Sequence, residues 1–202
     1  MSRGFRAYRV SISNLLLLMA VFAVALAWRR DNQRLINYYE TRLNPRPPWG
    51  TVQATGAPDT QGFGDLQTAW ASATQDGQKE WLIAEFEKAV LPSEIAIYET
   101  FNPGAVYQIS GLNEFGKESV LWSGTDPTPT TASGGISKIP LVAKSKFKRI
   151  KIYVDSPSVP GWTEIDAIGL TDGNLNQWAI RVKASSTYSS QYGSLFPLIT
   201  VR

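Results

Sequence analysis

Residues 147–154 read FKRIKIYV, and this stretch decides the fold. Apolar side chains occupy every second position from Ile150 to Val154, and the basic side chains of Arg149 and Lys151 lie on the opposite parity. Successive side chains of a strand point to opposite faces of the sheet. The alternation is therefore typical of an antiparallel strand with one buried and one solvated face. We interpret the surrounding basic run as the solvated face: Lys144, Lys146, Lys148, Arg149 and Lys151.

Similar β-rich runs lie outward from this stretch, separated by clusters of Gly, Pro, Asp and Ser. They are Glu80–Phe86, Glu94–Tyr98, Val106–Ser110, Val120–Ser123, Ser137–Val142, Thr163–Leu170 and Gln177–Val182. Residues 125–135 (TDPTPTTASGG) are a loop by composition. The sequence predicts a mainly β domain over residues 51–190, an antiparallel β-sandwich of the jelly-roll type with about eight strands. Residues 191–202 form a C-terminal tail.

The N-terminal region has a different character. Leu15 to Trp28 (LLLLMAVFAVALAW) is an unbroken apolar run, and extension back to Val10 gives 19 residues, or about 28 Å of helix. Arginines flank both ends, which predicts a single transmembrane helix that continues as a juxtamembrane helix within residues 1–43. Residues 44–50 (NPRPPWG) cannot continue a helix and are predicted to form a Pro-rich linker.

A cleaved signal peptide is the alternative for this segment, because a basic start and Ala25-Leu26-Ala27 fit that pattern. Bulky Trp28, followed at once by two arginines, favours an uncleaved signal-anchor. The positive charges are nearly balanced across the run. We predict an N-in, C-out bacterial membrane protein whose C-terminal domain is extracytoplasmic, either periplasmic or at the cell surface.

The composition narrows the chemistry of the domain. The net charge of +3 comes from the first 34 residues, which carry +5, so the remainder carries −2 and does not predict nucleic-acid binding. The chain has no Cys and no His, so disulfides, thiolates and imidazole bases are unavailable. The sequence thus predicts a protein that is not an enzyme.

Several motifs carry a resemblance. ATGAPDT (54–60), EWLIAEF (80–86), IYETFNPGAV (97–106) and IKIYVDSPSVPGWTEIDAIGL (150–170) occur in this order, with TAW (68–70), WSGTDPTP (122–129) and QWAIRVKASSTY (177–188). Over about residues 50–188 the chain resembles the galactose-binding-like jelly rolls, the superfamily of discoidin or coagulation-factor type C domains and many carbohydrate-binding modules. It is most similar to an uncharacterised, membrane-anchored bacterial subgroup.

The resemblance implies two sites. A structural calcium ion would be held by carbonyl oxygens and by Asp59 and Glu164, with Asp65 and Asp166 as weaker options. A ligand would bind through loops at one end of the sandwich, for which the candidates are Glu99, Phe101, Asn102, Asp155 and Trp162. The alternative for Trp162 is that it seals the edge of the sandwich.

Three functions follow from these features. The first is a membrane-anchored, non-catalytic binding module for carbohydrate or a cell-surface polymer. The second is a structural accessory subunit that docks on a membrane-protein partner. The third is a hydrolase built on Glu164 and Asp166, whose spacing of two on a strand reads equally as a polar edge.

Overall fold

The computed structural model describes residues 19–26, 28 and 46–191, and the chain divides into two compact units after Pro45. Residues 19–26 and 28 are helical with exposed side chains. Within the described residues, no helix is both long and apolar enough to cross a membrane. The rest of the predicted anchor and juxtamembrane helix lies outside the described residues, as does the tail from residue 192 onward.

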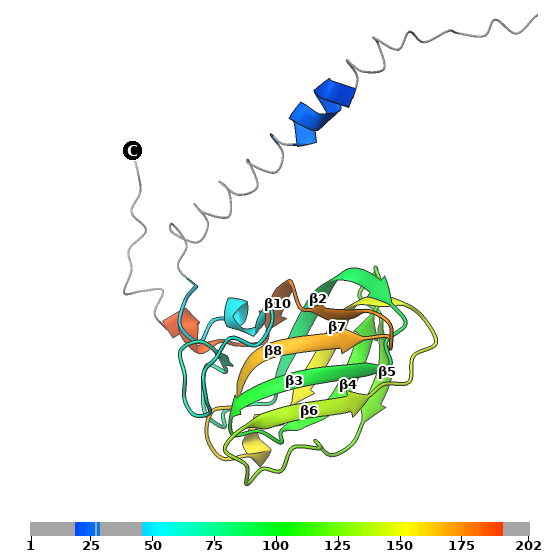
Figure 1. The fold of residues 1–202 in the computed structure, drawn as a ribbon. Helices are drawn as coiled ribbons and strands as arrows, with labels where there is room; N and C mark the ends of the chain where they lie inside the picture. Colours follow the sequence, from blue (N-terminus) through cyan, green and yellow to red (C-terminus); the bar gives the residue numbers. More distant parts are fainter. Residues whose placement is uncertain (1–18, 27, 29–45, 192–202) are drawn as a thin grey trace, which may run out of the picture. The chain divides into compact units, whose positions relative to one another are not determined.

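The second unit consists of two antiparallel sheets (Figure 1). One sheet has the order β1 (Trp70–Ala71), β8 (Glu164–Thr171), β3 (Glu94–Phe101), β6 (Gly135–Pro140), with β9 (Asn176–Trp178) also paired to β8. The other has the order β10 (Arg181–Ala184), β2 (Glu80–Val90), β7 (Phe147–Val154), β4 (Val106–Leu112), β5 (Glu118–Ser123). The described residues of this unit also form three short 3-10 helices: η1 (Thr51–Ala54), η2 (Ser156–Ser158) and η3 (Tyr188–Gln191). The predicted mainly β, sandwich-like architecture is confirmed.

Strand β7 has the predicted bounds and lies at the centre of its sheet, between β2 and β4. Its alternation works as expected, because Ile150, Ile152 and Val154 are fully buried. They join one apolar cluster that takes side chains from both sheets: Leu82, Phe86, Ile95, Ile97, Ile109, Ile139, Ile165 and Ile168. Removal of this apolar surface from water is the main force that holds the two sheets together.

The polar face of β7 is less solvated than the sequence predicted. Lys148 is exposed, but Arg149 and Lys151 are half-buried. The Lys151 ammonium lies 2.9 Å from a carboxylate oxygen of Glu118 and 4.5 Å from the ring centroid of Tyr153. Neighbouring strands thus partly cover this basic face.

The predicted strand Gln177–Val182 is in fact two strands. Ala179 donates its N–H to Ile168 of β8 at 2.9 Å, whereas Ile180 donates to Glu85 of β2 at 2.8 Å. The chain therefore passes from one sheet to the other between these two residues, which ends β9 and begins β10. Apolar periodicity does not reveal such a crossing, because the side chains on both sides of it face the same core.

Residues Arg46–Gly50, predicted as part of a spacer, pack on the sandwich unit. The Trp49 N–H donates to the Gln67 carbonyl at 3.1 Å, and the Trp49 carbonyl accepts from the Ala71 N–H at 3.3 Å. Trp49 takes a positive φ of 53°, a conformation that such fixed hydrogen bonds can maintain. The unit therefore begins before residue 51.

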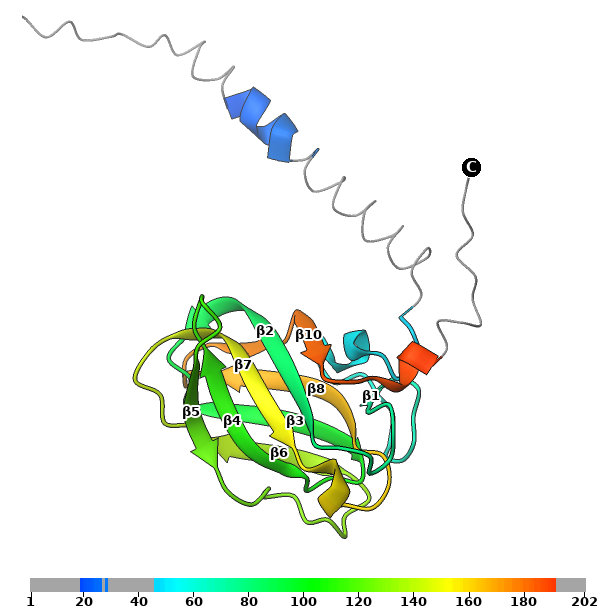
Figure 2. The same cartoon turned by 180° about the vertical axis from the view of Figure 1, so that it is seen from behind.

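Strand register brings distant loops to one end of the sandwich, which we call the loop end. Phe101 pairs with Glu164, and Val154 pairs with both Glu80 and Val106. The segments that leave these positions, residues 72–79, 102–105 and 155–163, are therefore neighbours. Figure 2 shows η2 at this end, beyond the tip of β7.

Candidate functional site

A cavity of about 70 Å³ lies at the loop end. Six residues line it, and they come from separate parts of the chain: Trp49, Asp65, Ala71, Trp162, Glu164 and Tyr188. Roughly 10–15 Å³ on this measure suffices for one water molecule, so the space admits a group of several heavy atoms. The cavity is small, but aromatic walls with a few converging polar groups are the lining that ligand sites usually have.

Three aromatic rings form its walls. The Tyr188 ring meets Trp49 edge-on at 5.3 Å between centroids and Trp162 at 5.7 Å. All three side chains are half-buried, so each keeps part of its surface open. Edge-to-face packing of this kind holds rings at defined angles.

The loop that carries Trp162 is held in place by Asn102, which directly follows β3. The Asn102 side-chain amide donates to the Trp162 carbonyl oxygen at 3.0 Å. Gly161 has a φ of +105°, and a Cβ there would lie 2.4 Å from the Asn102 amide nitrogen, so glycine is required. Among the described residues, the Trp162 indole N–H and the Thr163 hydroxyl are buried without a hydrogen-bond partner.

Two carboxyl groups complete the lining. The Glu164 side chain is nearly fully buried and accepts from the Leu66 N–H at 3.0 Å and from the Thr100 hydroxyl at 3.4 Å. Exposed Asp65 accepts from the Trp49 indole N–H at 2.9 Å. Burial, reinforced by the adjacent Asp65 carboxyl, raises the pKa of Glu164 to about 8 despite the Leu66 N–H, which lowers it.

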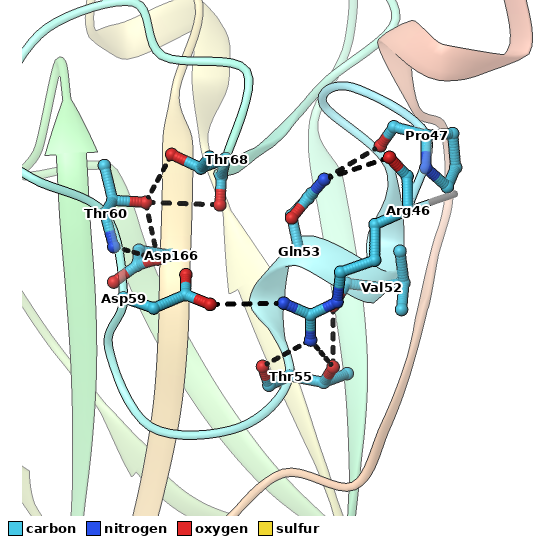
Figure 3. A network of polar contacts seen from close by, with 9 residues as sticks. All are labelled: Arg46, Pro47, Val52, Gln53, Thr55, Asp59, Thr60, Thr68 and Asp166. Atoms are coloured by element: carbon cyan, nitrogen blue, oxygen red, sulfur yellow. Dashed lines mark hydrogen bonds and ion pairs between the residues drawn. The ribbon is translucent and has the colours of Figure 1, made fainter. Parts of the chain in front are cut away.

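The other predicted calcium ligands occupy a separate network (Figure 3). Asp59 forms an ion pair with Arg46 at 3.3 Å, and Arg46 also donates to the Thr55 carbonyl at 3.2 Å. Asp166 accepts from the Thr60 hydroxyl at 2.6 Å and from the Thr60 N–H at 3.2 Å. Burial raises the pKa of Asp166, and the charge of Asp59 adds to this effect.

The structure thus pairs Asp59 with Asp166 and Asp65 with Glu164, whereas the sequence prediction grouped Asp59 with Glu164. Along β8 the register shifts between Ile165 and Ala167, so Asp166 is the extra residue of a bulge. This shift separates Glu164 and Asp166, the two acids of the hydrolase alternative, into different networks.

The residues do not fit a calcium ion as they lie. Calcium requires six to eight oxygen ligands, but here a guanidinium and several N–H and O–H donors face the acid oxygens. No group of three or more Asp, Glu, His or Cys side chains placed to hold a metal occurs in the described part of the chain.

Glu99 lies inside β3 and is nearly fully buried, not in a loop as predicted. Its carboxyl accepts from the Ser137 hydroxyl at 2.6 Å and from the Gly104 N–H at 3.2 Å. Ser137 also contacts buried Asp126, which accepts from the Val106 N–H at 3.0 Å. Burial, and then the charge of Asp126, raise the pKa of Glu99 to about 8.

The remaining predicted ligand residues lie nearby without lining the cavity. Phe101 is half-buried at the end of β3, opposite Glu164. Asp155 forms an ion pair with Lys79 at 2.7 Å. Of the five ligand candidates, Trp162 lines the cavity and Asn102 supports its loop.

Sequence reasoning missed Trp49, Ala71 and Tyr188. Trp49 falls in the predicted linker, and Tyr188 is the last residue of the motif QWAIRVKASSTY (177–188). Neither has a spacing to Trp162 that signals proximity, because the contact depends on how the segments before β1 and after β10 pack. The one feature of the sequence that could have pointed to Trp49 and Tyr188 is that each is an aromatic residue among polar neighbours.

Comparison with known proteins gives one family. Residues 37–180 match the family described as "Pappalysin-1, SD scarf domain, C-terminal". The matched segment includes Trp49, Asp65, Trp162 and Glu164 of the cavity and ends before Tyr188. No curated protein matches the chain.

Proposed function

Since the chain belongs to the family of the C-terminal SD scarf domain of pappalysin-1, we propose that its β-sandwich is a non-catalytic binding module whose ligand enters the loop-end cavity. One observation carries the proposal. Rings from Trp49, Trp162 and Tyr188 converge with the carboxyls of Asp65 and Glu164 around a single cavity.

Carbohydrate or a carbohydrate-bearing surface polymer is the proposed ligand class. Aromatic faces stack on the apolar faces of sugar rings, and fixed carboxyl oxygens accept hydrogen bonds from hydroxyls. A galactose-binding-like jelly roll remains part of this proposal. Its support is the chain path, which alternates repeatedly between the sheets from β2 to β10.

Attachment to the membrane is likewise proposed from the apolar run Leu15–Trp28, with the sandwich on the extracytoplasmic side. Protease treatment of intact cells tests this topology. We expect the domain to be digested without lysis when it lies at the surface, and after permeabilisation of the outer membrane when it is periplasmic. A domain that survives until the inner membrane is broken reverses the topology.

The binding test uses the full chain in mild detergent on a glycan array. We expect Trp162→Ala to abolish the signal, because it removes one wall of the cavity. Phe115→Ala is the matched control, since Phe115 is 87% exposed in the β4–β5 turn and lies outside the cavity lining. Equal binding by Trp162→Ala and wild type would show that the ligand binds elsewhere.

A scaffold role is the second candidate, and a specific feature favours it. Edge strand β5 and the adjoining β6–β7 loop expose Val120 and Val142 by 60% and 76%. The Val142 N–H donates to the Leu121 carbonyl at 3.1 Å, so the two segments are neighbours. Copurification of a stoichiometric partner that Val120→Asp releases, together with an empty glycan array, would favour the scaffold.

A further inference from the structure

The cavity is rich in hydrogen-bond acceptors and lacks positive charge. None of its six lining residues is Lys or Arg, and two of them are acids. The indole N–H of Trp49 is engaged by Asp65. The Trp162 indole N–H has no acceptor among the described residues, but the two acid side chains and the lack of Lys or Arg favour a ligand group that brings donors and positive charge.

The aromatic walls favour the same kind of group. A ring face carries negative potential, and two or three rings around a cavity attract ammonium groups. Here three rings stand around two carboxyls, and the T-shaped contacts of Tyr188 set Trp49 and Trp162 at steep angles to it, 75° and 82°. Aromatic rings and carboxyl oxygens, both attractive to an ammonium group, thus line one small volume.

We propose that the cavity between Trp49, Trp162, Tyr188, Asp65 and Glu164 binds a protonated amine of the ligand, and that the ligand is an amino sugar with a free amine. The amine part follows from the charge and aromatic character of the lining. The sugar part rests on the function proposed above.

The size of the cavity sets a limit on the group. A volume of about 70 Å³ admits an ammonium and the adjacent part of a sugar ring, but not a whole oligosaccharide. An N-acetyl group would replace the charge by a neutral amide and add bulk at the same point. The cavity should therefore distinguish free from acetylated amines.

Charge at the site supports this assignment. Glu164 is nearly fully buried beside Asp65, and within the described part of the chain neither carboxyl forms an ion pair with a Lys or Arg side chain. An ammonium that enters the cavity places a positive charge beside exposed Asp65 and buried Glu164, and such a charge favours the ionised form of a carboxyl group. The neighbouring Asp59–Asp166 network differs, since Arg46 already supplies positive charge there.

The test is calorimetric titration of the full chain in detergent with glucosamine oligomers, N-acetylglucosamine oligomers of equal length, and choline. We expect glucosamine oligomers to bind at least tenfold more tightly than the acetylated ones. Asp65→Asn and Glu164→Gln should each weaken glucosamine binding at least tenfold while keeping the shape of the lining. Asp59→Asn, an acid at the same end outside the cavity, should bind as wild type does.

The outcomes separate this inference from the proposed function. Equal binding of free and acetylated oligomers, lost in Trp162→Ala, overturns the amine assignment and leaves the binding module in place. If the protein binds choline but not glucosamine oligomers, the assignment of the ligand as an amino sugar is overturned. If the wild-type protein binds none of the sugars, both the amino-sugar inference and the proposed sugar-binding function are overturned. If Glu164→Gln does not fold, Asp65→Asn decides, because Asp65 is exposed.

Discussion

Two of the acid pairs at the loop end differ in what surrounds them. Glu99 and Asp126 are enclosed by Ser137, Thr128 and backbone N–H groups. Asp65 and Glu164 lie beside a cavity with aromatic walls. Both Glu99 and Glu164 have a pKa of about 8, raised mainly by burial.

A perturbed pKa alone therefore does not identify a ligand site. The enclosed pair fills its acceptors within the protein and thereby ties the end of β3 to residues 104–106 and β6. The cavity pair keeps an open side. Proximity to free space, and not the titration behaviour, distinguishes the candidate site from the structural pair.

The largest expected effect is on the enclosed pair. Asp126→Ala removes the acceptor of the Val106 N–H at 3.0 Å and of the Thr128 N–H at 2.9 Å. Buried donors left unpaired cost about 1–3 kcal/mol each, so we expect the free energy of unfolding to fall by about 4 kcal/mol. Urea denaturation of the full chain in detergent measures this. A loss below about 1 kcal/mol, the usual net value of one hydrogen bond, would show that the pair is not structural.

The second effect is on pH dependence. Glu99 and Glu164 each have a folded pKa of about 8, above the value near 4.3 of an unfolded Glu. Their protonated forms stabilise the folded state, so this contribution is fully present below about pH 4 and is lost as pH rises to about 8. We expect the two groups together to lower the free energy of unfolding by several kcal/mol over that range.

Thermal unfolding between pH 5 and 8 checks this dependence. Glu99→Gln should flatten the profile, because it replaces the titrating group by a neutral one of the same shape. A Glu164→Gln profile that still falls as steeply as that of wild type would place the titration elsewhere.

A smaller effect is expected where the cavity joins β3. Gly161→Ala introduces a Cβ 2.4 Å from the Asn102 amide at a φ of +105°. Strain at such a position costs about 1–3 kcal/mol. Calorimetry should show a lower Tm together with weaker ligand binding, since the Trp162 loop must shift. Gly116→Ala, also at positive φ but with open space around its Cβ, is the control for backbone strain alone.

The smallest effect on stability is expected for the cavity acids themselves. Asp65→Asn keeps an oxygen acceptor for the Trp49 indole N–H, so the free energy of unfolding should change by about 0.5 kcal/mol or less, as for other exposed positions. Denaturation of the Asp65→Asn variant should therefore show the stability of wild type, whereas calorimetric titration of the same sample should show weakened ligand binding. A large fall in stability would make this pair structural like the other one.

Much of the fold was predictable from local patterns. The alternation in residues 147–154 and six of the seven similar runs predicted the strands from β2 to β8, because burial of one strand face leaves a period of two in the sequence. The sheet crossing at Ala179–Ile180 was not predictable, and neither was the bulge at Asp166, since neither interrupts the apolar pattern. The calcium prediction stays a prediction that the present arrangement of Asp59 and Glu164 does not support.

The sequence by itself determined the β-rich class, the strand faces of β7 and the absence of His and Cys chemistry, because composition and period are local properties. It also marked Trp162 as a candidate. Tertiary structure alone decided that Trp49 and Tyr188 join Trp162, and that Glu99 is enclosed while Glu164 faces a cavity. These features depend on which distant segments pack together, and identical local sequences can be either lining or core according to that packing.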